Sequence, residues 1–296
     1  MSDAWKRFSA SVTGAVANRS ALERFDLGAL AALGPEERDL AEALLIERVA
    51  SREDDPRVVE ALTQLATPTA QAALARIVAE PVASMTRLAA AGVARDARAI
   101  ADVLERTARD DLRDVAATVA ATLLANAVLD AALIAAATST TNAITRHALV
   151  DAALTRRGRP AAARVPPDGS FWVLPLVASA VAAVRAYGLA RLTALGPATN
   201  RTSTNYDALR AKLADPAADL RDALAAFYDP EDRAWAVDAL VWRLGKGDLR
   251  APPALASVQT EQTRAVLAAM ATEATGELAS AIASALKATP PGDPCG

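Results

Sequence analysis

Apolar residues recur along this chain at positions i, i+3, i+4 and i+7, the spacing that gathers side chains on one face of an α-helix. Residues typical of helix starts and stops separate these stretches. Strand signals are nearly absent, because no alternating run rich in Val, Ile, Thr or Tyr stands out and no Asn-Gly or Asp-Gly pair joins two such runs. The pattern therefore predicts an all-α protein.

The expected helices are short and come in pairs. When the first helix of each pair is aligned on an apolar residue that we expect to point inward, the spacings are 27, 30 and 29 residues; the aligned residues are Val58, Met85, Val115 and Ile144. Two helices of about 12 residues and two turns fill such a period. A period of 27–30 residues predicts an α-solenoid of stacked antiparallel helix pairs.

Several expected helices open with an acid followed two positions later by arginine. We expect the acid to cap the first turn and to complement the helix dipole, and the arginine stem to cover the neighbouring helix. A ladder of ligand-binding arginines is the alternative interpretation. The pairs are Asp55–Arg57, Asp96–Arg98, Asp111–Arg113, Asp219–Arg221 and Glu231–Arg233.

Two segments share an acid-Pro start that leads into an arginine and a Leu/Ala-rich first helix. They are DPRVVEALTQLATPTAQAALARIVAE at 55–80 and DPEDRAWAVDALVWRLGKG at 229–247. With these segments the chain resembles the HEAT-repeat family, in particular the short bacterial HEAT-like repeats. The resemblance covers residues from about 35 to 157 and from about 205 to 288, and it is poor over 158–204. It implies stacked helix pairs, and its motifs specify architecture rather than chemistry.

The chain is expected to form two helical halves. N-terminal repeats cover residues 1–157, and an Arg/Pro-rich connector covers 158–170. C-terminal repeats cover 171–288, and residues 289–296 are expected to form a disordered tail.

The second half begins with a stretch that predicts one long helix over 171–196, with Pro175 in its first turn, where proline is tolerated. A polar loop is expected over 196–205. Further helices are expected to start near Tyr206, Pro216, Pro230, Glu261 and Gly276.

Composition sharpens this picture. Alanine, the best helix former, supplies 77 of 296 residues and allows helix axes to approach closely. A formal net charge of −3 lacks the basic excess of a dedicated nucleic-acid binder. The N-terminal residues lack the apolar run of a signal peptide, and the uncharged stretches at 115–129 and 171–184 fit buried helices better than membrane spans. We therefore expect a cytoplasmic protein, and the Arg-over-Lys bias suggests a GC-rich bacterial genome.

Motifs for catalysis are missing from the sequence. There is one histidine, His147, one cysteine, Cys295, and neither a phosphate-binding loop, a dinucleotide glycine fingerprint nor a zinc spacing. His147 and Asp151 stand four residues apart and could share a helix face, but a surface or half-buried structural histidine is the favoured interpretation. We expect a protein that is not an enzyme and that uses no cofactor or metal.

The leading functional hypothesis is a non-enzymatic scaffold that binds another protein through the concave face of the solenoid, as an adaptor or an immunity-like protein. Interface hot spots favour Trp, Tyr and Arg, so the large aromatic and arginine side chains are the candidate contacts. The sequence specifies neither the identity of the partner nor the oligomeric state. The candidate partner-binding residues are Trp172, Tyr228, Trp235, Trp242, Arg233, Arg243, Arg156, Arg157 and Arg159.

A nucleic-acid binder is the alternative, because HEAT-like folds include bacterial glycosylases that remove alkylated bases. Trp235 and Trp242 lie seven residues apart on one expected helix, with Asp232 and Asp238 beside them and arginines flanking. This grouping is the closest approach to a base-handling site, although aromatics at helical spacing are also typical of a core. A structural part of a larger assembly, with the catalytic centre on another chain, is a third possibility.

Overall fold

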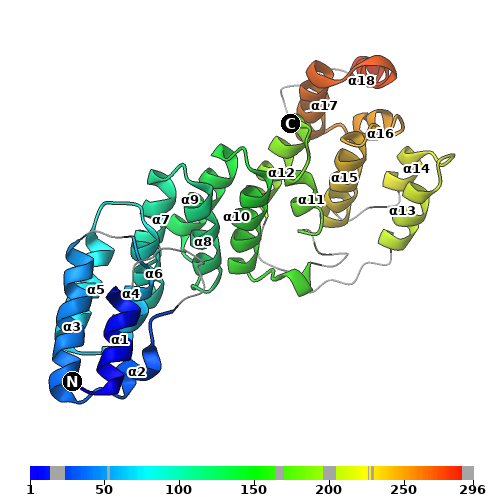
Figure 1. Ribbon diagram of the computed structural model, residues 1–296. Helices are drawn as coiled ribbons and strands as arrows, with labels where there is room; N and C mark the ends of the chain where they lie inside the picture. Colours follow the sequence, from blue (N-terminus) through cyan, green and yellow to red (C-terminus); the bar gives the residue numbers. More distant parts are fainter. Residues whose placement is uncertain are drawn as a thin grey trace. The chain divides into compact units, whose positions relative to one another are not determined.

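The computed structural model describes residues 1–13, 24–51, 54–164, 168, 170–195, 205–225, 227 and 230–288. The chain divides into two compact units, Met1–Ala136 and Ala137–Gly296. All regular structure within the described residues is helical, so the predicted all-α class is confirmed (Figure 1). The connector predicted at 158–170 lies inside the second unit and contains a short 3-10 helix, Ala161–Ala163.

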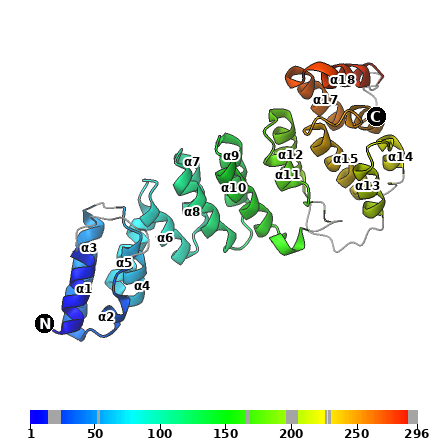
Figure 2. The same ribbon diagram turned by 45° about the vertical axis from the view of Figure 1, so that its right-hand side comes forward.

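In the first unit, successive helices pack as neighbours. Each helix from α3 to α7 contacts the next one along the chain, and α3, α4 and α6 also contact the next but one. Figure 2 shows α3, α4 and α5 side by side, as Figure 1 does. This is the contact pattern of stacked helix pairs. The helices are α1 (Asp3–Thr13), α2 (Leu27–Ala31), α3 (Pro35–Ala50), α4 (Arg57–Leu65), α5 (Pro68–Ala79), α6 (Met85–Ala94), α7 (Ala97–Arg106), α8 (Asp110–Ala121) and most of α9 (Ala127–Ser139).

Three consecutive helices of the first unit, α5, α6 and α7, start at short polar side chains. The Thr67 hydroxyl accepts a hydrogen bond from the Ala70 amide at 3.0 Å, at the start of α5. Ser84 caps α6 in the same way, and the Asp96 carboxylate accepts hydrogen bonds from the first amides of α7. These caps satisfy backbone donors that the first helical turn leaves unpaired. They mark the starts of α5, α6 and α7 as three separate helices.

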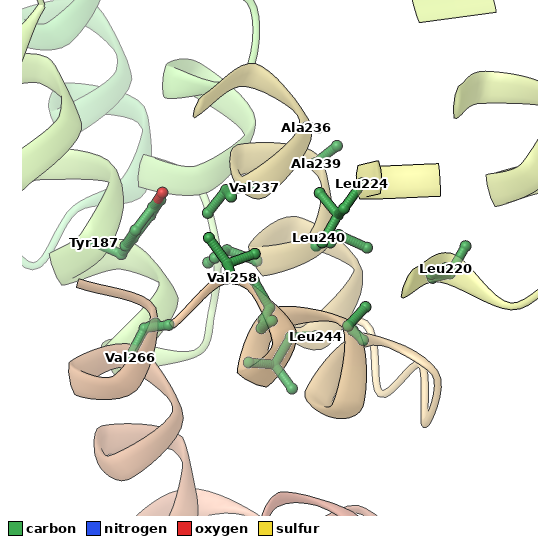
Figure 3. Close-up of a cluster of buried hydrophobic side chains, with 14 of the residues drawn as sticks. Tyr187, Leu220, Leu224, Ala236, Val237, Ala239, Leu240, Leu244, Val258 and Val266 are labelled. Carbon is green, nitrogen blue, oxygen red and sulfur yellow. The ribbon is translucent and has the colours of Figure 1, made fainter. Parts of the chain in front are cut away.

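In the second unit, helices distant in sequence also pack together. Besides contacts between consecutive helices, α11 packs against α15 and α12 packs against α17. Figure 3 shows the resulting core, with side chains from α12, α14, α16 and α17 gathered around those of α15. The helices are α10 (Ala143–Arg156), α11 (Val173–Val177), α12 (Ala182–Ala194), α13 (Asn205–Ala214), α14 (Leu220–Ala225), α15 (Pro230–Leu244), α16 (Ala251–Val258), α17 (Glu261–Glu273) and α18 (Gly276–Ala288).

The long helix predicted over 171–196 is wrong. The structure has two helices there, α11 and α12, which fold back on each other. Gly188 makes the close approach possible, because a Cβ at this position would lie 2.8 Å from Leu176 Cβ and 2.9 Å from the Val177 nitrogen. The Glu273 carboxylate accepts hydrogen bonds from the Ala182 and Ala183 amides and so caps the new helix start from α17.

The repeat register taken from the sequence is also partly wrong. Val58 is buried, as expected, but Ile144 is 78% exposed. Asn142 caps α10 and leaves Ile144 on the outside of the first turn, while Thr145 and Arg146 face inward. The inward positions of these first helices therefore include arginine and threonine as well as aliphatic residues.

Helices α15, α17 and α18 start where the sequence predicted, at Pro230, Glu261 and Gly276. Helix α14 starts at Leu220 rather than near Pro216. Helix α16 was not predicted, because two prolines stand at its start; a helix tolerates proline in its first turn. The loop expected at 196–205 falls, except for Asn205, outside the described residues, as does the tail at 289–296. Of the helices that are described, none combines the length and the apolarity needed to cross a membrane.

Candidate protein-binding groove

The three tryptophans proposed as partner contacts come together in the second unit. Trp172, just before α11, lies with its ring centroid 5.8 Å from that of Trp235 and 5.4 Å from that of Trp242, both on α15. Phe171 and Tyr206 extend the group at centroid distances of 5.0 and 6.3 Å. Trp235 is only 4% exposed. These rings join α11, α13 and α15, and their arrangement is that of a packed aromatic core.

Arg243 and Arg233, the two arginines proposed beside this cluster, differ in burial and contacts. The guanidinium of Arg243 and the ammonium of Lys246 each lie 5.6 Å from the Trp242 ring centroid, and Arg243 donates a hydrogen bond to the Leu213 carbonyl at 2.9 Å. The half-buried Trp242 ring is thus already covered by two cations. Arg233 is exposed on α15, and Tyr228 lies outside the described residues.

Arg156, Arg157 and Arg159, which the sequence offered as partner contacts, bond within the chain instead. Arg156 and Arg159 are 7% and 4% exposed, and Arg159 forms an ion pair with Asp168. The guanidinium of Arg157 donates a hydrogen bond to the backbone carbonyl of Leu192. These side chains therefore fix the end of α10 and the following turn, since buried charges are stable only when paired and hydrogen-bonded.

The sole histidine does not form a pair with Asp151. His147 is exposed on α10, and Asp151 instead accepts a hydrogen bond from Arg164, which also donates to the Thr155 hydroxyl at 3.0 Å. Across the described part of the chain, no group of three or more His, Cys, Asp or Glu side chains could hold a metal ion.

Asp238, the acid that the glycosylase alternative placed beside the tryptophans, is completely buried. Its carboxylate accepts hydrogen bonds from the Tyr187 hydroxyl at 2.7 Å and from Arg191 Nε at 2.8 and 3.0 Å. Burial raises the pKa of the Asp238 carboxyl, and Arg191 and Tyr187 offset part of that rise. The carboxylate joins α12 to α15 and is closed to a base approaching from solvent.

The acid-x-Arg motif proves to be a local clasp in most of its described copies. In these pairs the acid accepts the amide of the arginine two positions on, and the guanidinium folds back onto the same carboxylate at 2.6–3.1 Å. Asp111 instead pairs with Arg109. The clasped pairs are Asp55–Arg57, Asp219–Arg221 and a further one, Asp248–Arg250.

Arg98 departs from this pattern. Asp96 caps α7 through the amides of Arg98 and Ala99, both at 3.0 Å, but it does not clasp the Arg98 guanidinium. That guanidinium is exposed and, among the described residues, makes neither a hydrogen bond nor an ion pair. It lines a groove instead.

The groove lies in the first unit, is walled by α5, α6 and α7, and has a volume of about 750 Å³. Its α5 wall consists of residues spaced i, i+3, i+4, i+7 and i+8, which share one helix face. Across from them stand Arg87, Ala90, Val93 and Ala94 of α6. Val93 is 51% exposed, so the apolar floor is open to solvent. The α5 residues are Gln71, Leu74, Ala75, Val78 and Ala79.

A network of charged side chains lies along the α7 side of the groove. Asp102 accepts hydrogen bonds from Arg87 Nη1 at 2.7 Å and from Arg106 Nε at 2.6 Å, and Arg87 also donates to the Val78 carbonyl at 3.1 Å. Burial acts to raise the pKa of Asp102, but the two arginines outweigh it and the pKa lies below its ordinary value. Because two arginines share one carboxylate, the network of Arg87, Asp102 and Arg106 carries a net positive charge.

The sequence reasoning missed this site. Asp102 and Arg106 stand four residues apart on one helix, a spacing that signals an ion pair. No comparable signal marks Arg87, because an arginine in the first turn of a helix is ordinarily taken as solvated. The groove itself exists only once three helix faces have been packed together.

A smaller groove of about 400 Å³ lies against α16 and α18 in the second unit. Leu249, Pro253 and several alanines line it, and Arg221, already clasped by Asp219, is the one charged side chain among its described lining residues. It therefore offers shape without an available charge.

No protein-family model, no curated protein and no solved structure matches the chain.

Proposed function

We propose that the chain is a HEAT-like helical-repeat scaffold that binds another protein without catalysing a reaction, and that the groove of α5, α6 and α7 is its contact surface. The observation that carries the proposal is the open apolar floor around Val93 beside a guanidinium, that of Arg98, with no partner among the described residues. Exposed apolar surface rimmed by charged side chains is typical of interaction sites.

The residues that the sequence favoured as partner contacts are better explained as structural residues. Trp235 is buried in an aromatic cluster, and Arg156 and Arg159 are buried at the end of α10. The glycosylase alternative loses support for a similar reason, because Asp238 is enclosed by Tyr187 and Arg191. The groove, in contrast, combines accessible apolar atoms with accessible charge.

Photo-cross-linking of the full chain tests the proposal. A photoreactive amino acid placed at Val93 is expected to cross-link a specific protein in a lysate of the source cells, and excess unmodified chain should compete for it. The matched control is the same amino acid at Leu124, which is 87% exposed in the same unit and outside the groove. Equal products from both positions, or none from Val93, would contradict the proposal. Salt-sensitive binding of duplex DNA would support the alternative instead.

A further inference from the structure

We infer that the groove of α5, α6 and α7 accepts an acidic amphipathic α-helix from its partner. This inference rests on the proposed function and adds the shape and the charge of the segment that binds. It follows from the backbone of the groove walls, the dimensions of the apolar floor and the state of its charged side chains.

The groove walls favour a helix over an extended peptide. An extended peptide gains affinity by pairing its backbone with a sheet edge or, as a polyproline II segment, by docking in an aromatic-lined groove. The three walls here are helices whose backbone groups bond internally, and none of the described lining residues is aromatic. An extended segment on the apolar floor would leave its own amides and carbonyls unpaired, which is costly. A helix satisfies these groups within itself and presents side chains only.

The size of the floor fits two turns of such a helix. The lining face of α5 runs from Gln71 to Ala79, which is about 12 Å at 1.5 Å per residue. The i and i+7 anchors of an amphipathic helix are about 10 Å apart along its axis. Leu74, Val78 and Val93 supply the aliphatic surface on which these anchors would pack.

The charges select an acidic partner. Three arginines and two aspartates line the groove, and both aspartates are already engaged. Asp96 caps α7, and Asp102 is shared between Arg87 and Arg106. Arg98 is the cation that the acid-x-Arg clasp leaves open. A carboxylate on the partner helix would pair with Arg98 and meet the positive surplus near Arg106, whereas a lysine there would be repelled.

The test is the binding of synthetic helices to the full chain, followed by fluorescence anisotropy. The probe is a labelled peptide of about 18 residues, long enough to form a helix, with Leu at i, i+4, i+7 and i+11 and Glu on both flanks. One comparison peptide carries Lys in place of Glu, and another carries Ser in place of Leu. The Glu peptide is expected to bind at least about tenfold more tightly than either. Its affinity should also fall as salt rises.

Variants of the chain locate the binding. Arg98→Glu is expected to weaken the Glu peptide about five- to tenfold and to reduce the preference over the Lys peptide. Val93→Asp is expected to abolish measurable binding of the Glu peptide. The controls are Arg38→Glu, exposed on α3 outside the groove, and Leu124→Asp; both should bind as the unmodified chain does. Circular dichroism melting establishes whether each variant is folded. We expect all of them to fold, because the substituted side chains are exposed.

The outcomes separate the two proposals. If neither charged peptide binds, or if both bind equally, the inference of an acidic helix is overturned, while specific cross-linking from Val93 would still support a protein-binding groove. If the chain self-associates and Val93→Asp abolishes the association, a second copy occupies the groove and the inference is again overturned. Loss of specific cross-linking together with loss of peptide binding would overturn both.

Discussion

Replacing Asp238 by alanine is expected to destabilise the second unit by about 3–4 kcal/mol. The substitution leaves the Tyr187 hydroxyl and the Arg191 guanidinium without the acceptor that they share. An unsatisfied buried hydroxyl costs about 1–3 kcal/mol, and breaking a buried ion pair costs about 3–5 kcal/mol. The two costs are not additive, and 14% of the Arg191 side chain is exposed, so water relieves part of the penalty.

Urea unfolding followed by tryptophan fluorescence measures this change, because three of the four tryptophans lie in the second unit. Asp219→Ala is the matched control. Asp219 also accepts hydrogen bonds from an arginine, Arg221, but its side chain is 43% exposed, so its loss should cost less than about 1 kcal/mol. Equal midpoint shifts for the two variants would refute the conclusion that the buried carboxylate joins α12 to α15.

Two further predictions concern packing and acid stability. Gly188→Ala should lower the thermal midpoint of the second unit, since overpacking against Leu176 costs about 1–3 kcal/mol, more than the gain of about 1 kcal/mol in helix propensity. Gly92→Ala, whose Cβ would lie 2.9 Å from Val119 Cγ1 and would meet no backbone atom, should lower the midpoint of the first unit in calorimetry by less than Gly188→Ala lowers that of the second. Burial alone would raise the pKa of the Asp55 carboxyl, but Arg57 holds this pKa below its ordinary value of 3.8. The ion pair of Asp55 and Arg57 therefore stabilises the fold above about pH 4, and this stabilisation is lost as the pH falls through the lowered pKa. Asp55→Asn should flatten this acid-side loss in melts at about pH 3–6, and an unchanged slope would contradict it.

Local chemistry made the helices of the first unit predictable. Thr67, Ser84 and Asp96 are side-chain caps, and each stands where the hydrophobic period restarts. The prediction of a single helix over 171–196 failed, because that stretch is continuous in helix-forming residues. The break depends on Gly188 and on a cap from Glu273, about ninety residues later in the chain.

The candidate site was harder to predict than the fold. Sequence reasoning takes Trp235 as a possible partner contact and does not single out Arg87, whereas packing buries both. Alanine is part of the reason, since an Ala-rich helix such as α9 is apolar nearly all round and carries little information about which face turns inward. The acid-x-Arg motif was visible, but only the structure shows that Arg98 is left open while Arg57, Arg221 and Arg250 are clasped.

The central claim is that the groove of α5, α6 and α7 binds a protein, and Val93 tests it most directly. The decisive measurement is the dissociation constant of the protein recovered by cross-linking, for the unmodified chain, Val93→Asp and Leu124→Asp. Val93→Asp should weaken binding more than about tenfold, because the complex loses the burial of one aliphatic side chain and must desolvate a carboxylate in its place. Leu124→Asp should bind as the unmodified chain does. Equal affinity for all three chains would contradict the account.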